Sequence, residues 1–140
     1  MGTATSYTLP ANSGSAYKFR VIAENSVGES TASPDSAVII AANAPDSPTD
    51  LARVYADDTQ ITIEWVAPVE TGGIPVIDYK VYWDFGEGGA HVEISSTTDN
   101  NKLFTQDSDI ISGKTYSFTV VAVNAVDESV QSDPLLVIAA

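Results

Sequence analysis

A chain of 140 residues without cysteine excludes disulfides, zinc–thiolate sites and thiol catalysis. Its hydrophobic fraction of 44% is enough for a core, while its net charge of −13 repels nucleic acid and anionic lipid. The charge is uneven, because residues 45–140 hold sixteen acidic and four basic side chains. No apolar run is long enough to span a bilayer. We therefore expect neither a nucleic-acid partner nor membrane insertion by this segment.

The first strand-like segment is residues 17–25, in which apolar and polar side chains alternate with a period of two. The same pattern returns at residues 116–124, and Tyr, Phe, Val, Ala and Asn occupy alternate positions in both copies. Downstream serines recur at the same offset of 99 residues. Repetition on this scale indicates a tandem array. Between the copies, residues 44–48 contain two prolines and are interpreted as a linker.

Strand-like runs separated by Asp, Gly and Pro turns occupy the rest of the chain. They are residues 51–55, 61–65, 77–84, 90–95, 102–105, 116–124 and 135–139. No helical periodicity interrupts them. Seven short strands with frequent turns predict an all-β fold, a two-sheet antiparallel β-sandwich.

Several of these segments resemble the fibronectin type III family. Residues 48–51 together with residues 61–68 are similar to the opening of such a module. Residues 72–81 are similar to its BC loop and C strand, and residues 113–120 are similar to its F strand. The resemblance implies an immunoglobulin-like sandwich in a tandem array. It covers residues 44–140 as a complete module, and residues 1–43 as the C-terminal part, strands E, F and G, of a preceding module.

Two aromatic residues fit this family's core. Tyr116 stands where a tyrosine corner is expected, with its ring inside and its hydroxyl bound to the preceding loop, and Tyr17 is its counterpart in the first copy. Trp65 is expected to anchor the second strand. An immunoglobulin domain proper would need a cysteine pair around Trp83, and the absence of cysteine excludes it.

Three strands in residues 1–43 cannot bury a sandwich core alone. Three explanations stay open: the chain is a slice of a longer array, a neighbouring molecule supplies the missing strands, or the segment packs back on the complete module. The matched apolar pattern of Tyr17, Phe19 and Val21 favours the first two, because it fits a native sandwich partner.

Catalysis has little support in the sequence. His91, the one histidine, follows a glycine turn, lies in no nucleophile-elbow context, and is interpreted as a surface residue. No cofactor motif occurs. The loops at one pole of the predicted sandwich collect six carboxylates, a low-probability calcium cluster weighed against solvated loops: Asp57, Asp58, Asp84, Glu87, Asp107 and Asp109.

A protein-contact face has more support. If Tyr116 and Phe118 point inward, then Val121 and Val123 point outward, and Tyr82 joins them from the neighbouring strand. These three residues are predicted to form an exposed apolar patch, against the alternative of ordinary scattered apolar residues.

The sequence thus predicts a non-enzymatic structural or adhesive repeat from a cell-surface stalk or extracellular filament. Its partners would be proteins or neighbouring copies of itself, with strand complementation between chains as one mode of assembly. Two alternatives are an accessory module of a secreted carbohydrate-active enzyme and a module of an intracellular giant scaffold protein.

Overall fold

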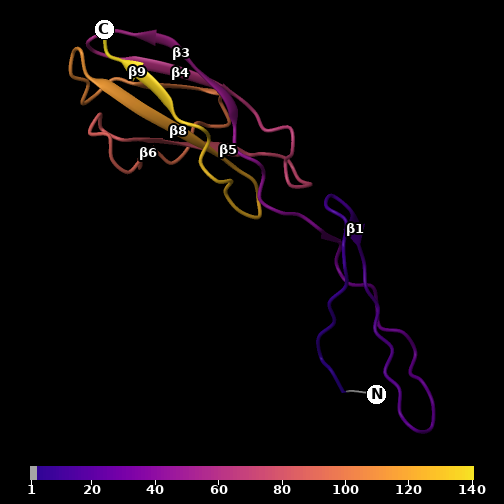
Figure 1. The fold of residues 1–140 in the computed structure, drawn as a ribbon. Coiled ribbons are helices and arrows are strands. Elements are labelled where there is room, and N and C mark those ends of the chain that lie inside the picture. Colours follow the sequence, from indigo (N-terminus) through magenta and orange to yellow (C-terminus); the bar gives the residue numbers. More distant parts are fainter. Residues whose placement is uncertain (1–2) are drawn as a thin grey trace. The chain divides into compact units, whose positions relative to one another are not determined.

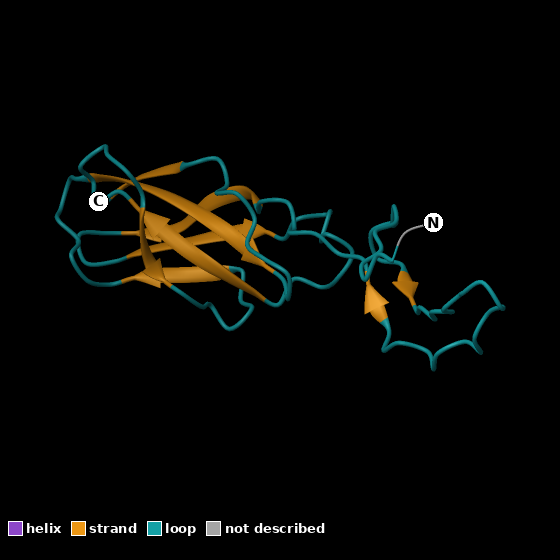
Figure 2. Ribbon diagram, turned by 90° about the horizontal axis from the view of Figure 1, so that it is seen from below, coloured by secondary structure: helices purple, strands orange, loops and turns teal. Residues whose placement is uncertain are grey.

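A computed structural model describes residues 3–140, and the chain divides into two units between Ala42 and Asn43. The longer strands lie in the second unit, whereas loops make up most of the first (Figure 2). No described residue lies in a helix, so the described fold is all-β, as predicted.

The second unit contains two antiparallel sheets (Figure 1). The first has the order β3-β4-β7, and the second has the order β6-β5-β8-β9. The strands are β3 (Thr49–Ala56), β4 (Ile61–Val66), β5 (Asp78–Trp83), β6 (Val92–Ser95), β7 (Leu103–Gln106), β8 (Thr115–Val123) and β9 (Leu135–Ile138). All seven predicted strands are present, and the antiparallel β-sandwich is confirmed.

The core lies between these sheets because alternate side chains of each strand point inward. Most of its members come from three strands: Ile61, Ile63 and Trp65 from β4, Tyr79, Val81 and Trp83 from β5, and Tyr116, Phe118, Val120 and Ala122 from β8. The ring of Trp83 stacks on that of Tyr116 at 4.9 Å between centroids, and Trp65 meets Tyr79 edge-on at 5.5 Å. Aromatic rings from neighbouring strands of one sheet and from the two facing sheets therefore pack together in the core.

Tyr116 forms the predicted tyrosine corner. Its buried hydroxyl accepts a hydrogen bond from the N–H of Ile111 at 2.8 Å and donates one to the carbonyl of Asp109 at 3.1 Å. In the first unit, the hydroxyl of Tyr17 accepts a hydrogen bond from the N–H of Asn12 at 3.0 Å. The same residue spacing thus gives the same local contact in both copies.

The segment interpreted as a linker, residues 44–48, is packed onto the second unit instead. Its two prolines, Pro45 and Pro48, are buried. Just before it, the N–H of Asn43 donates to the carbonyl of Gly72 at 2.8 Å. Gly72 has φ +77°, and a Cβ built there would lie 2.1 Å from the carbonyl oxygen of Asn43. Only glycine allows this close approach, so the segment belongs to the module.

Asn124 completes this attachment. Its side-chain amide donates hydrogen bonds to the carbonyls of Asn43 at 2.7 Å and Thr71 at 2.9 Å. Its side-chain oxygen accepts the N–H groups of Val126 and Asp127 and so closes the turn after β8. One buried side chain thereby connects three loops.

The first unit forms two short strands, β1 (Ala16–Tyr17) and β2 (Ile39–Ile40), paired antiparallel. The strand E expected before β1 is absent from residues 3–15. The remaining part of the predicted strand, residues 18–25, runs beside residues 29–36 and is held by three serines, Ser30, Ser33 and Ser36. Without a second layer, the unit leaves Val21 70% exposed.

Replacing Tyr116 with Phe is expected to lower the free energy of unfolding by about 1–3 kcal/mol. The ring stack on Trp83 remains, but the N–H of Ile111 and the carbonyl of Asp109 lose their partner. Urea denaturation measures the change. Tyr82→Phe is the matched control, because the half-exposed hydroxyl of Tyr82 makes a single 3.3 Å contact with Glu93. Equal effects of the two changes would contradict the role given to Tyr116.

Candidate contact face of the four-stranded sheet

The outer face of the β6-β5-β8-β9 sheet carries the residues predicted to contact proteins. On β5 and β8, Asp78 lies opposite Val123, Lys80 opposite Val121, and Tyr82 opposite Thr119. These pairs point away from the core because Tyr79 and Val81 point into it. The register therefore brings Tyr82, Val121 and Val123 to one face, as the period-two pattern requires.

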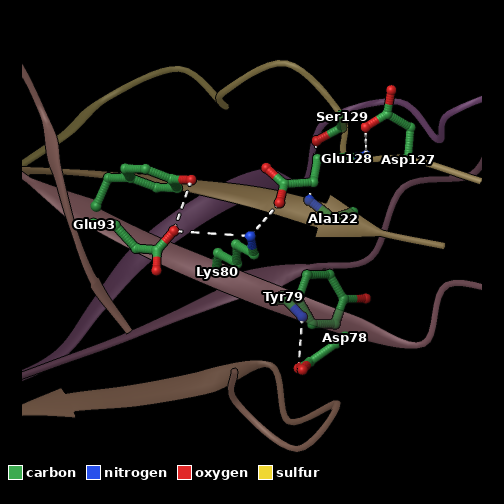
Figure 3. Close-up of polar contacts among 9 residues, drawn as sticks. Asp78, Tyr79, Lys80, Glu93, Ala122, Asp127, Glu128 and Ser129 are labelled. Atoms are coloured by element: carbon green, nitrogen blue, oxygen red, sulfur yellow. Dashed lines mark hydrogen bonds and ion pairs between the residues drawn. The ribbon is translucent and has the colours of Figure 1, made fainter. Parts of the chain in front are cut away.

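Lys80 lies at the centre of this face, between two carboxylates (Figure 3). Its ammonium group donates a hydrogen bond to Glu128 and lies 3.8 Å from Glu93. The hydrogen bond to Glu128 raises the pKa of Lys80 above its ordinary value. Because all three side chains are partly exposed, the two ion pairs add little to stability, under about 1 kcal/mol each. The side chains of Lys80, Glu93 and Glu128 are therefore accessible to a protein partner.

Tyr82 extends the group toward β6. Its hydroxyl donates to Glu93 at 3.3 Å. Burial raises the pKa of Tyr82, and the nearby carboxylates Glu128 and Glu93 raise it further. Tyr82 thus stays neutral at physiological pH and presents a ring and a hydroxyl at the surface.

The predicted exposure of Val121 is wrong, because only 3% of the residue is accessible. Lys80 lies directly opposite Val121 on β5, and its ion pairs to Glu93 and Glu128 are on the same face. Tyr82 and Val123 are half-buried. The face is therefore a polar group over a covered valine rather than an open apolar patch.

Two aspartates fix the loops that border this face. The carboxylate of Asp78 accepts the N–H groups of Tyr79, Thr98 and Asn100 at 2.8–3.2 Å. Burial acts to raise the pKa of Asp78, but hydrogen bonds from the loop of residues 97–100 and from Tyr79 outweigh it, and the pKa lies below its ordinary value. Asp78 therefore attaches the loop after β6 to the start of β5.

Asp84 does the same for the turn between β5 and β6. Its carboxylate accepts the N–H groups of Gly86 at 2.8 Å, Gly88 at 3.1 Å and Ser117 at 2.9 Å. Burial acts to raise the pKa of Asp84, and these backbone donors outweigh it, so the pKa is lowered. The carboxylate is fully used in holding the turn against β8.

The six carboxylates weighed as a calcium cluster do not meet. Within residues 3–140, no group of three or more His, Asp or Glu side chains is placed to hold a metal ion. Asp57 instead accepts hydrogen bonds from Tyr55, Thr59 and Gln60, and Glu87 pairs with Lys114 at 2.7 Å. The arrangement gives the calcium hypothesis no support.

His91 hydrogen-bonds to the hydroxyl of Ser117 through its Nε2 atom, at 2.8 Å. Asp84 is close by in the fold, but its oxygens accept backbone N–H groups rather than the imidazole. The three residues therefore lack the carboxylate–imidazole bond that orients a catalytic histidine. His91 is half-buried rather than a fully exposed surface residue.

Sequence reasoning missed Lys80, Glu93 and Glu128 as members of the face. Opposite charges on neighbouring strands pair only when the register of the strands brings them together, and alternation within each strand does not predict that register. It also missed the role of Asn124, although the recurrence of Asn at positions 25 and 124 was a signal.

Comparison with known proteins gives the family. The pattern of the family described as "Fibronectin type III domain" matches residues 46–137, about two thirds of the chain. The chain belongs to the fibronectin type III family. The match covers all of β3 to β8 and nearly all of β9, which are the strands of the second unit.

Two much longer proteins are similar in sequence to this fibronectin type III chain. Chicken "M-protein, striated muscle" is 30% identical over 86% of the chain, and human "Myomesin-2" is 34% identical over 89% of it. The chain covers 8% and 9% of these proteins, so it spans less than a tenth of either. Their whole-protein roles do not follow from so short a match.

The solved structure of titin domains A168–A170 superposes with a TM-score of 0.71 and 19% identity. It covers 92% of this chain, which covers 42% of the titin fragment. At this identity the likeness establishes the fold alone. Residues 3–140 also include no helix long and apolar enough to cross a membrane.

Val121→Thr in the fibronectin type III module is expected to lower the free energy of unfolding by about 1–3 kcal/mol, because it puts a hydroxyl without a partner under Lys80. Val123→Thr, at the half-buried end of β8, should change it by less than about 0.5 kcal/mol. Thermal and urea denaturation of both variants check this. Equal effects would show that Val121 is exposed.

Acid is expected to destabilise the module. The pKa values of Asp78 and Asp84 are lower in the folded chain than the ordinary 3.8, so their contribution is complete above about pH 4 and is lost as pH falls below it. Asp84→Asn should lower stability at pH 7 by about 1.5–3 kcal/mol, since charged acceptors bind more strongly, and should flatten the acid-induced loss. Urea titrations from pH 2.5 to 7 measure both. An unchanged pH profile in Asp84→Asn would refute the assignment.

Proposed function

We propose that this chain is a non-enzymatic structural repeat of a long multi-domain protein and acts through protein contacts. The observation that carries the proposal is the duplicated ribbon. The hydrogen bonds that hold β8 to its return strand recur at an offset of 99 residues in the first unit. Repeated modules joined end to end space or connect other components, and this role requires no active site.

The relatives support the scaffold form of this proposal. M-protein and myomesin-2 are each more than ten times as long as the segment that they share with this chain, and one is named from striated muscle. A module of a giant scaffold protein therefore fits these comparisons. They lend no support to the cell-surface stalk, the extracellular filament or an adhesive role expected from the sequence.

Residues 1–43 are proposed to be the C-terminal part of a preceding module, as the sequence predicts. The first unit contains the counterparts of β8 and β9 and of the tyrosine corner, in the same order. An array of at least two fibronectin type III modules in the parent protein follows from this assignment.

The contact face is proposed to be centred on Lys80, with Tyr82 and Val123 beside it. Val121 supports this face from beneath and does not itself touch a partner. Residues 45–140 carry sixteen acidic and four basic side chains, so the surface attracts a partner, or a segment of a neighbouring copy, that is rich in Lys and Arg.

Force spectroscopy tests the structural role. A chain of four tandem copies of residues 43–140 should unfold in discrete steps of about 300 Å, the extended length of about one hundred residues less the folded module. Gradual extension without steps would contradict a role as an independent structural repeat.

Retention of the intact chain on insoluble cellulose or chitin tests the carbohydrate-enzyme alternative. We expect no more retention than for serum albumin, because the outer face offers ion pairs rather than a platform of aromatic rings. Specific retention would favour an accessory module of a carbohydrate-active enzyme.

A further inference from the structure

The first unit contains a two-stranded ribbon, residues 14–41, whose internal hydrogen bonds copy those of the module. The N–H of Val21 donates to the hydroxyl of Ser33 at 2.9 Å, and that of Val120 to Ser132 at 3.0 Å. The N–H of Gly14 donates to the carbonyl of Ala41 at 2.7 Å, as does that of Gly113 to Ala139. The ribbon therefore has the local structure of β8 and β9 without the rest of a sandwich.

One edge of this ribbon is unpaired. In the module, the N–H of Ile77 donates to the carbonyl of Val123, and that of Asp84 donates to Ser117, at the two ends of the β5–β8 pair. Between these ends, Thr119 and Val121 of β8 lie opposite Tyr82 and Lys80 of β5. At the offset of 99 residues, Ser117, Thr119 and Val121 correspond to Lys18, Arg20 and Ile22, whose backbone groups have no hydrogen-bond partner within residues 3–140. The side chains of Lys18 and Arg20 turn to Asp35. An open edge of this kind is a template for an added strand.

The inner face of the ribbon is uncovered as well. Tyr116, Phe118 and Val120 of β8 are fully buried beneath the other sheet. Their counterparts are Tyr17, Phe19 and Val21, which remain partly or largely exposed. Phe19 and Val21 line an open hollow together with Tyr7 and Ile39.

Asn25 shows which contacts are missing. Its side-chain oxygen accepts the N–H groups of Val27 and Gly28, as that of Asn124 accepts Val126 and Asp127. The amide nitrogen of Asn124 also binds two carbonyls from segments that precede β5. The amide nitrogen of Asn25 has no such partner in residues 3–140.

We propose that this ribbon binds the β3–β7 half of a fibronectin type III module, with a β5-type strand on the edge at Lys18, Arg20 and Ile22. The partner is defined by its chemistry: an alternating strand with aromatic inward positions, such as Tyr79 and Trp83, and a second sheet that covers the inner face of the ribbon. The proposal rests on the assignment of residues 1–43 to a preceding module.

The test mixes the full chain with a probe polypeptide, residues 43–106 of this same sequence, which contains β3 to β7. Light scattering should give a one-to-one complex, and hydrogen exchange at the amides of Lys18, Arg20 and Ile22 should slow by about tenfold or more. Val21→Asp should abolish binding because it puts a charge on the inner face. Val27→Asp is the matched control, since Val27 lies at the hairpin tip and is 94% exposed.

Two outcomes would overturn the proposal. Binding that survives Val21→Asp would mean that the probe exchanges with β8 and β9 of the complete module. Dimers formed without probe and lost in Val21→Asp would mean that the ribbon takes a second copy of itself.

A fused chain tests the same claim if the probe aggregates. In it, residues 43–106 precede residues 8–140, since residue 107 corresponds to residue 8 in the repeat. Protected amides at Lys18, Arg20 and Ile22 would support the proposal, and free exchange there beside a normally folded second module would refute it. If the ribbon fails to bind in both the mixture and the fused chain, the stepwise unfolding of residues 43–140 under force is still expected. A failure of this proposal can therefore be distinguished from a failure of the proposed structural role.

Discussion

The inward face of β8 is the surface on which the module is assembled. Tyr116, Phe118, Val120 and Ala122 are completely buried there, against β5 on the same sheet and β4 from the other. Burying each large apolar side chain contributes about 1.5–3 kcal/mol, so this strand accounts for a substantial part of the core. The first unit has the same apolar side chains and the same internal hydrogen bonds but no covering layer. The comparison separates the local structure of the ribbon from the packing that stabilises it.

Polar residues at the ends of the strands then attach the loops. Asp78, Asp84 and Asn124 each accept hydrogen bonds from two or three backbone N–H groups. Each also connects segments far apart in the sequence, Asn124 through its side-chain amide nitrogen. Buried backbone donors need such partners, because an unsatisfied one costs about 1–3 kcal/mol. Of the six carboxylates weighed as a calcium cluster, Asp84 attaches a loop in this way, while Asp57 and Glu87 bind Tyr55 and Lys114.

The alternation of apolar and polar residues in the sequence correctly predicted which strand side chains point into the core. Alternation placed Tyr116 and Trp65 in the core, and the resemblance to the fibronectin type III family predicted the corner at Tyr116. Alternation failed at Val121 because a period of two gives the face of a side chain but not what covers it, here Lys80 from the neighbouring strand. Residues 44–48 have the composition of a linker, yet Gly72 and Asn124 bind the residue before them across the module. Strand E was expected from family resemblance, and within residues 3–15 there is no sheet for it to join.

The most direct test of this account is native-state hydrogen exchange at two matched pairs of amides. Val21 and Ala23 in the ribbon, and Val120 and Ala122 in the module, all donate to serine hydroxyls at 2.9–3.0 Å. If the covering layer provides the stability, the amides of Val120 and Ala122 should exchange only by global unfolding of the module, and those of Val21 and Ala23 close to the unprotected rate. Equal protection of the two pairs would show that the ribbon is stable by itself and would contradict the central claim.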